Sequence, residues 1–515
     1  MERGSAGLHI GLAGWRIFVP AFVFIGVLSV LWALASPILS GPDETAHAAK
    51  AIAQVRGQIT GHSELGAHYP VVNLPDSYRY SDQITCFAGH PNVPADCGAS
   101  LGDSSGVDYF ATWVSGYNPI YYYLVGWPSL FFGGSAGIIA MRIVSALLSS
   151  ALLAWAFQAA LSTSKARWMA AASVFLVSPM ITYLAAMINP QGLEISAAAA
   201  LWIGMLRLVQ TFGEDPPLAH SRRALWVMVT VASVFLASAR SLGPLWVVII
   251  VALTLVIVGW RQTKRLFTTA SSYPPIGLIA VATGFSLAWT VSTGTLSGQA
   301  AMNDVPLVGG SFLQGAWATF RNTSGYVQEA AGVFGWLDTW LPGSLYAVYY
   351  IALAILVIIA LTSTGRYGLC RLGLVIAASF LVPILVQGYS VNQTGMIWQG
   401  RYGVVLYVGV PLVAAWLLSH EPSGRLDFLA VRITAITAGF VWFFGIVAFF
   451  LSLHRYAVGA NSPLFSIIRQ AKWEPPLGWV LLCLIFTLVA AGFAVWVWRI
   501  AARAGNRADI DLAHD

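Results

Sequence analysis

The chain has 515 residues, of which 57% are hydrophobic and only 9% are charged, and its mean hydropathy is +0.72. Soluble domains carry about 25% charged residues, so this composition excludes an ordinary soluble protein. The net charge of +6 is small for the length and is spread along the chain, which argues against a nucleic-acid partner. We therefore predict an integral membrane protein.

Apolar runs recur along the whole chain, and a helix needs about 20 such residues to cross the hydrocarbon core of a bilayer. The runs lie at residues 16–39, 137–161, 168–187, 192–210, 224–239, 242–259, 271–290, 343–363, 370–389, 402–419, 432–453 and 476–499. The first run lacks a small-residue cleavage site, so we expect a retained helix rather than a signal peptide. The predicted fold is all-α, a polytopic bundle of about twelve spans that forms one transmembrane domain over residues 1–515.

The basic residues predict the orientation of the bundle. With the N-terminus in the cytoplasm, most of the 27 Lys and Arg residues fall in short connections on that same side, as the positive-inside rule requires. Both termini are then cytoplasmic, and two large loops, 40–136 and 291–342, face outward. Residues 118–133 would invert this pattern as a further span, so we expect an interfacial or re-entrant helix there.

The cysteines fit an outward-facing first loop. Cys86 and Cys97 both lie in residues 40–136, on the side where disulfides persist, so we predict that they form a disulfide. Cys370 and Cys483 lie at or within spans, and we expect neither to pair.

The segment Pro42-Asp43-Glu44-Thr45-Ala46-His47 directly follows the first span. If a helix begins at Pro42, Asp43 and His47 are four residues apart and share a face. A partly desolvated carboxylate beside an imidazole is suited to act as a general base or a metal ligand. The alternative is structural, because a proline followed by acids in the first turn is also how an ordinary helix begins.

Two more polar segments border later spans. Gly335-Trp336-Leu337-Asp338-Thr339 ends the second large loop, and an acid among indole rings suits a sugar, although Trp gathers at any membrane interface. Gln399-Gly400-Arg401-Tyr402 opens the tenth span from outside. An Arg there opposes the helix dipole, so we predict an anionic partner for Arg401, above all a phosphate. The alternative is an Arg that reaches toward lipid headgroups.

Single polar residues on the outer side complete the candidates. Arg240 and Arg455 break the positive-inside trend, and each either pairs with an acid of the large loops or joins Arg401 in an anion site. The turn from Asn189 to Glu194 places an acid just inside the membrane, where ionisable side chains are usually functional.

These segments, in this order, resemble a bacterial family of predicted multi-spanning membrane proteins of unknown function. The resemblance rests on Pro42-Asp43-Glu44 with His47, on Gly335-Trp336-Leu337-Asp338-Thr339, and on Gln399-Gly400-Arg401-Tyr402, and it covers nearly the whole chain. That family is grouped with the type C glycosyltransferases (GT-C), membrane enzymes that use sugars linked to a lipid phosphate. The resemblance implies an inverting sugar transfer at the outer face of the bacterial inner membrane.

The implied partners are a polyprenyl-phosphate sugar donor, a cell-envelope glycan or lipid acceptor, and membrane lipids. Asp43 matches the essential acid after the first helix, and the predicted catalytic group is Asp43, Glu44 and His47. The predicted ligands of the donor phosphate are Arg401, Arg240 and Arg455. The predicted sugar or acceptor contacts are Trp336, Asp338, Gln399, Asn189, Tyr121 and Trp127. After the first helix there is no Asp-x-Asp motif but only the adjacent pair Asp43-Glu44, so this pair is the candidate for holding a divalent metal such as Mg, Mn or Ca.

Three other functions compete with this interpretation. A transporter or flippase for a lipid-linked substrate would place its charges near the middle of the membrane and often shows repeats, whereas here the notable charges lie at the outer ends of spans. A scaffold protein would tolerate the loss of Asp43. A glycan polymerase with a lipid-pyrophosphate donor is close to the proposed transferase in chemistry.

Overall fold

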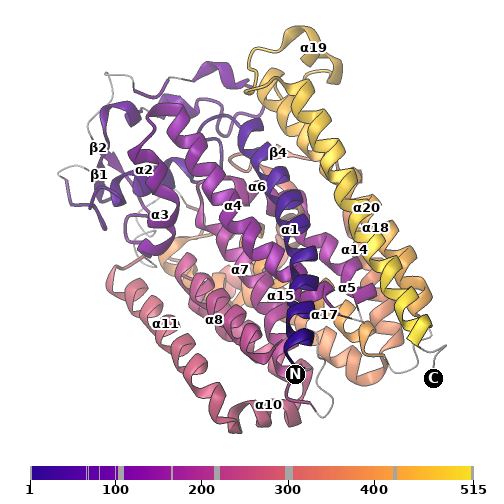
Figure 1. The fold of residues 1–515 in the computed structure, drawn as a ribbon. Helices are drawn as coiled ribbons and strands as arrows, with labels where there is room; N and C mark the ends of the chain where they lie inside the picture. The colour runs from indigo at the N-terminus through magenta and orange to yellow at the C-terminus, as the bar shows by residue number, and fades with distance from the viewer. Residues whose placement is uncertain are drawn as a thin grey trace.

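The computed structural model describes residues 3–511 except 65–66, 68, 81, 99, 103–108, 164–165, 214–220, 296–304 and 422–425. These residues form a bundle of long helices with two small two-stranded sheets (Figure 1). The start of α1 and the end of α20 lie at one end of the bundle, together with α10, and α2, β1, β2 and α19 lie at the other. The all-α prediction is confirmed.

The long helices are α1 (Arg3–Ala35), α4 (Gly134–Leu161), α7 (Pro190–Gln210), α8 (Arg222–Ala239), α11 (Tyr273–Ser292), α14 (Gly343–Ser363), α15 (Gly365–Thr394), α17 (Gly409–Ser419), α18 (Asp427–Val458) and α20 (Trp479–Asp511). Within the described residues, 10 helices are long and apolar enough to cross a membrane, or up to 12 if each of two bent pairs is one span. Each predicted run corresponds to one of them, so the prediction of about twelve spans is confirmed.

The two bent pairs have local causes. In the first, α5 (Ala166–Ser173) and η5 (Val174–Val177) meet α6 (Pro179–Ala186) at 52°. Ser178 is extended there, with ψ 153°, because the ring of a following proline disfavours the helical conformation. In the second, α9 (Gly243–Val258) meets α10 (Trp260–Thr268) at 118°. Gly259 makes this turn at φ 116°, a conformation that favours glycine.

The end of the bundle that is predicted to face outward, called the outer end below, is built from short elements of the two large loops. The first loop holds α2 (Glu44–Gln54), β1 (Val71–Asn73), η1 (Asp76–Tyr78), η2 (Asp82–Thr85), η3 (Ala95–Cys97), β2 (Tyr109–Ala111), α3 (Pro119–Gly126) and η4 (Trp127–Leu130). The second holds α12 (Phe312–Arg321), α13 (Thr323–Gly332), β3 (Val333–Phe334) and β4 (Thr339–Trp340). Both sheets are antiparallel, with Val71 opposite Ala111 and Val333 opposite Trp340.

Five more short elements complete the description. They are η6 (Ala270–Ser272) before α11, η8 (Gly400–Gly403) with α16 (Val404–Tyr407) before α17, and η9 (Leu464–Ser466) with α19 (Ile467–Gln470) before α20. Helix α3 has 8 residues, which is about 12 Å of helix and far short of a bilayer core of about 30 Å. The expectation that residues 118–133 do not form a further span is therefore confirmed.

A fully buried ion pair joins the end of α1 to α2 and α4. Arg142 of α4 donates from Nε to Glu44 Oε1 at 2.7 Å and from Nη2 to Glu44 Oε2 at 2.5 Å. The same carboxylate accepts from the backbone N–H groups of Gly41 and Ile188 at 2.9 and 3.0 Å. The remaining guanidinium donors bind the carbonyls of Ala33, Ser36 and Pro37. Two buried charges are tolerated here because nearly all of their polar atoms have partners.

We predict that Glu44→Gln destabilises the protein strongly. The substitution keeps the shape of the side chain but leaves Arg142 charged and buried, which costs about 3–5 kcal/mol when one partner of a buried pair is removed. The free energy of unfolding of the purified protein in detergent measures this loss. The matched control is Glu64→Gln, because Glu64 is exposed and its contact with His62 is 3.8 Å long. A loss below about 1 kcal/mol, the size expected for an exposed pair, would contradict the assignment.

Candidate active site at the outer end of the bundle

An ion pair between Asp43 and Arg401 defines the candidate site. Asp43 precedes α2 in the left-handed region, at φ 58°, which aspartate tolerates better than most residues. Its Oδ2 accepts a hydrogen bond of 2.7 Å from Nη2 of Arg401, which lies 358 residues later in η8. The Arg401 side chain is buried, whereas 27% of the Asp43 side chain is exposed. The carboxylate therefore stays within reach of a ligand.

Arg401 is held in place by its own segment. Its Nε donates to Oε1 of Gln399 at 2.5 Å, and the neighbouring Gly400 donates its backbone N–H to the carboxylate of Glu329 in α13. Its Nη1 is buried and has no hydrogen-bond partner among the residues that the structure describes. An unpartnered N–H of a buried guanidinium is costly, so this atom is suited to an acceptor supplied by a ligand.

A second guanidinium lies beside the first. Arg240, directly after α8, places its Cζ 4.3 Å from the ring centre of Tyr402, and the Cζ of Arg401 is 5.2 Å from the same ring. Arg240 Nη1 lies 4.0 Å from Oε2 of Glu194, and its buried Nε has no partner in the described part of the chain. Asp43 and Glu194 balance the two positive charges, so an incoming anion has to compete with these acids.

The electrostatics keep Asp43 ionised. Burial acts to raise the pKa of the Asp43 carboxyl, but the Arg401 guanidinium beside it outweighs burial, with help from Arg240. The pKa of Asp43 is therefore below its ordinary value. By contrast, burial raises the pKa of Glu329, and the N–H of Gly400 and the charge of Arg401 oppose that rise only in part.

His47, Tyr122 and Lys50 form a buried polar group one turn along α2. Nδ1 of His47 is 2.9 Å from the Tyr122 hydroxyl, and Nζ of Lys50 lies 4.9 Å from the centre of the Tyr122 ring. Lys50 donates to the carbonyls of Ile59 and Ser115 at 2.8 and 2.6 Å. Burial lowers the pKa of His47 to about 3 and that of Lys50 to about 7, so His47 is neutral near pH 7.

Three of the residues predicted to contact a sugar have other surroundings in the structure. Asn189 caps α7 and donates from Nδ2 to the carbonyl of Pro42 at 2.8 Å, so it supports the turn that carries Asp43. Tyr121 is buried, with its hydroxyl 3.1 Å from Oγ of Ser145, which leaves no ring face for a sugar. Trp127 is 47% exposed on η4 beside Phe131, as expected of a residue at the membrane interface.

The two adjacent acids do not act together. Asp43 pairs with Arg401, and Glu44 is engaged by Arg142 and two backbone N–H groups. In the part of the chain that the structure describes, no group of three or more His, Cys, Asp or Glu side chains is placed to hold a metal ion. We therefore leave Glu44 and a metal out of the proposed chemistry.

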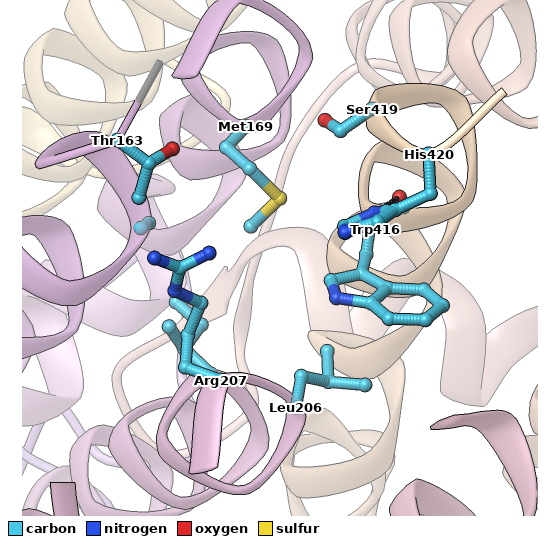
Figure 2. A pocket seen from close by; sticks show the side chains of 9 residues that line it. Thr163, Met169, Leu206, Arg207, Trp416, Ser419 and His420 are labelled. Carbon is cyan, nitrogen blue, oxygen red and sulfur yellow. Dashed lines mark hydrogen bonds between the residues drawn. The ribbon is translucent and has the colours of Figure 1, made fainter. Parts of the chain in front are cut away.

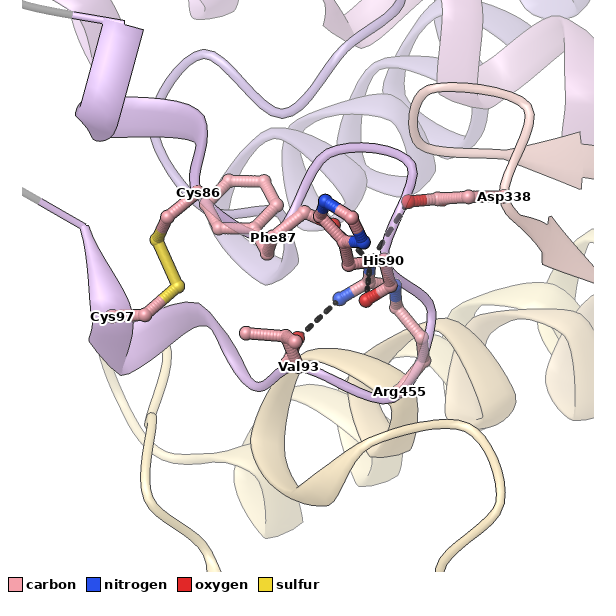
Figure 3. The surroundings of a disulfide bond; sticks show 7 residues. All are labelled: Cys86, Phe87, His90, Val93, Cys97, Asp338 and Arg455. Carbon is pink, nitrogen blue, oxygen red and sulfur yellow. Dashed lines mark hydrogen bonds and ion pairs between the residues drawn. A yellow bond between two sulfur atoms is a disulfide. The ribbon is translucent and has the colours of Figure 1, made fainter.

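Arg455 and Asp338 form a separate cluster around the disulfide (Figure 3). Nη2 of Arg455, near the end of α18, donates to Oδ2 of Asp338 at 2.8 Å. The same guanidinium donates to three carbonyls of the loop closed by the disulfide, at 2.7 Å for Phe87, 3.2 Å for His90 and 3.0 Å for Val93. The predicted Cys86–Cys97 disulfide is confirmed, and Cys370 and Cys483 are free. Arg455 and Asp338 thus join the two large loops, and we leave both out of the proposed phosphate and sugar contacts.

Trp336 lies in the turn between β3 and β4, next to Asp338. The turn begins at Gly335, with φ 65°, whose N–H donates to the hydroxyl of Tyr183 at 3.0 Å. Trp336 is half-buried, and its Nε1 has no partner within the described residues. Its role in binding a sugar stays a prediction.

A large apolar cavity lies among the helices, and neither Asp43 nor Arg401 lines it. Its volume is about 350 Å³, and its lining includes Val327, Ala330, Tyr349, Tyr350, Ala354, Ser379, Val404 and Tyr407. Val404 follows Arg401 by three residues, and Val327 and Ala330 flank Glu329 in α13. The segments that position Arg401 therefore also form one end of the cavity.

The sequence interpretation missed two charged residues of this region. Arg142 lies within the apolar run 137–161, and a charge inside a span is itself a signal of a buried partner or a functional site. Glu329 lies in the second large loop, with no motif around it, and only the packing of α13 against η8 brings it to Gly400.

The fold and composition define a polytopic membrane protein. The chain belongs to the family described as "Predicted membrane protein (DUF2142)", whose model matches residues 24–410. No curated protein matches the chain. Among solved structures, the chain is similar to ArnT from Cupriavidus metallidurans in the apo state, with 15% identity over 96% of this chain and 77% of that one. The TM-score is 0.42, an overlap too loose to define a shared activity.

We predict that Arg455→Met lowers stability without affecting ligand binding at Asp43. The change leaves Asp338 unpaired and buried and releases the carbonyls of the disulfide loop, which costs about 3–5 kcal/mol. Denaturant unfolding in detergent measures the loss. Arg469→Met is the control, because Arg469 is exposed in nearby α19. Unchanged stability together with weakened donor binding would contradict this assignment and support Arg455 as a ligand of the donor phosphate.

Proposed function

We propose that this protein transfers a sugar from a polyprenyl-phosphate donor to a cell-envelope glycan or lipid acceptor at the outer face of the membrane. The observation that carries the proposal is the combination of the Asp43–Arg401 pair with an apolar cavity of about 350 Å³, one end of which is formed by the segments that position Arg401. A donor with a charged phosphate and a long apolar tail needs these two environments next to each other. The bond between the sugar and the phosphate of this donor also has to lie at the end of the bundle rather than among the apolar spans.

The phosphate would bind between Arg401 and Arg240. Each has one buried N–H group without a partner in the described structure, and both guanidinium groups lie close to the ring of Tyr402. Guanidinium groups bind phosphate oxygens through short, charge-assisted hydrogen bonds. Gln399 holds Arg401 in orientation through its Nε, so less side-chain entropy is lost on binding.

The first part of the polyprenyl chain would occupy the apolar cavity. Its volume lies within the range of about 300–1,000 Å³ that is common for sites of small ligands. The cavity therefore suits only a short stretch of the tail, and the rest would lie in the bilayer.

Binding of the phosphate would also make Asp43 a stronger base. In the resting site Arg401 holds the pKa of Asp43 below its ordinary value, which makes the carboxylate a weak base. A phosphate that takes up the guanidinium donors competes with Asp43 for them, so the pKa of Asp43 rises toward the range useful for proton transfer. The base is then strongest when the donor is present.

The chemical step is a single displacement at the anomeric carbon. The acceptor hydroxyl oxygen forms a bond to that carbon as the bond from the carbon to the phosphate oxygen breaks, with inversion. Asp43 takes the proton of the acceptor hydroxyl. Arg401 and Arg240 stabilise the charge that develops on the leaving polyprenyl phosphate. His47, neutral and hydrogen-bonded to Tyr122, would hold the start of α2 in place beside Asp43.

The direct test is transfer of labelled sugar from a set of polyprenyl-phosphate donors to membrane acceptors, by the full chain in proteoliposomes. We predict that Asp43→Asn lowers the rate by about 100-fold or more, the usual contribution of a general base, while the donor still binds. We expect Arg401→Gln to weaken donor binding instead. Glu64→Gln, which changes an exposed acid of the same loop, should leave both quantities unchanged.

Two outcomes would reject the proposal. One is a wild-type protein that transfers no label from any donor, and the other is an Asp43→Asn variant with normal activity. Recovery of labelled donor on the opposite leaflet, with no label on any acceptor, would instead identify a lipid transporter.

The cavity makes its own prediction. Ala354→Phe fills the cavity from α14, so we expect KM for the lipid-linked donor to rise by roughly tenfold, equivalent to about 1.4 kcal/mol, with kcat little changed. Ile358→Phe is the matched control, because Ile358 lies one turn further along α14 and is exposed. Equal KM values for the two variants would exclude the tail from this cavity.

A further inference from the structure

A second cavity of about 350 Å³ lies between α10 and the ends of α7, α9 and α17. Figure 1 shows α10 at the opposite end of the bundle from α2, the helix that directly follows Asp43. The side chains that matter in its lining are Arg261, Gln262 and Arg265 of α10, Gln210 of α7, and Trp416 and His420 from the end of α17. The basic connections predict that this end is cytoplasmic. The proposed transfer uses none of these residues.

Helix α10 has the character of a helix that lies along a membrane surface. It turns away from α9 by 118°, and Oγ1 of Thr263 fastens it by donating to the carbonyl of Leu255 at 3.1 Å. Leu266 is buried against the bundle, whereas Trp260 is 76% exposed at its start. Such an arrangement of aromatic, apolar and basic faces is typical of helices at the boundary between headgroups and acyl chains.

The two arginines of α10 line one side of the cavity. Arg261 and Arg265 are four residues apart and therefore project from the same face of the helix. Both are exposed and line the cavity, and Nη1 of Arg265 also donates to the carbonyl of Phe212 at 3.3 Å. This contact orients one guanidinium toward the end of α7.

The opposite wall is polar and carries a third guanidinium. Nε2 of Gln210 is 2.5 Å from Nε2 of His420, whose ring stacks on Trp416 at 4.4 Å. Nη1 of Arg207 donates to Oε1 of Gln210 at 3.2 Å. Figure 2 shows the Arg207 guanidinium in a small neighbouring cavity of about 10 Å³, which shares Trp416 and His420 with the larger one. Nε of Arg207 is buried and has no partner among the described residues.

The charge of this cavity differs from that of the Asp43 site. Two arginines line it, Arg207 lies behind its wall, and no acidic side chain lines it among the residues that the structure describes. Arginine and polar side chains around a cavity that opens beside an interfacial helix match a lipid phosphate with its polar headgroup. We infer that this cavity binds the phosphate of an anionic phospholipid headgroup.

The test is native mass spectrometry of the full chain in detergent, with phosphatidylglycerol and phosphatidylcholine of the same acyl chains in competition. We expect the wild type to prefer phosphatidylglycerol. Arg261→Gln should reduce the preference about fivefold, and Arg261→Gln with Arg265→Gln more than about tenfold. Arg366→Gln, an exposed Arg at the start of α15 outside the cavity, should leave it unchanged. Unfolding without lipid checks that the variants are folded.

Three outcomes would overturn the inference. Equal loss of preference in Arg366→Gln would mean a diffuse surface charge rather than a site. A loss in Arg401→Gln with none in Arg261→Gln would place the lipid at the outer site. Equally tight binding of sn-glycerol 1-phosphate, which has the phosphate but no acyl chains, would assign the cavity to a soluble phosphate compound. None of these measurements depends on sugar transfer, so the two proposals succeed or fail separately.

Discussion

The buried pair of Glu44 and Arg142 is the constraint on which the outer site depends. A guanidinium inside an apolar helix bundle is tolerated only when its charge and its N–H groups are satisfied, and Arg142 meets this condition with one carboxylate and three carbonyls. Those partners come from the end of α1 and the start of α2. The turn between the two helices is thereby held in one position, and Asp43, the residue before Glu44, is presented at the edge of the site.

The ion pairs of Arg142, Arg401 and Arg455 with their acids differ in how many of their polar atoms have hydrogen-bond partners. In Glu44–Arg142 and Asp338–Arg455 the carboxylate is buried and the arginine also binds several backbone carbonyls, so both pairs connect elements of the fold. In Asp43–Arg401 the acid is partly exposed and Nη1 of the arginine has no partner within the described residues. Of these three pairs, only Asp43–Arg401 has both access and unused hydrogen-bonding capacity, which are the properties that a ligand site requires.

The two large cavities illustrate two ways in which a membrane protein meets a lipid. The apolar cavity is bounded at one end by the segment that carries Arg401, whose charge is balanced by Asp43, so it suits a substrate whose charged group has to react and then leave. The cavity beside α10 is polar and basic, and it adjoins aromatic residues exposed at the surface. That combination suits a headgroup that stays bound, because two arginines on one face of α10 can contact its phosphate together.

The sequence by itself determined the spans, the two large loops, the disulfide between Cys86 and Cys97, and Asp43 and Arg401 as residues of interest. These properties depend on local apolar length, on the distribution of charge between loops, and on short motifs.

The sequence did not determine which charges pair. Glu44 was expected to assist Asp43 and Arg455 to join Arg401, whereas Glu44 pairs with Arg142 and Arg455 with Asp338. These partners are 98 and 117 residues apart, and Asp43 and Arg401 are 358 apart. Only the packing of the helices decides such contacts, because a side chain reaches a few ångströms and its sequence neighbours do not indicate which helix lies beside it.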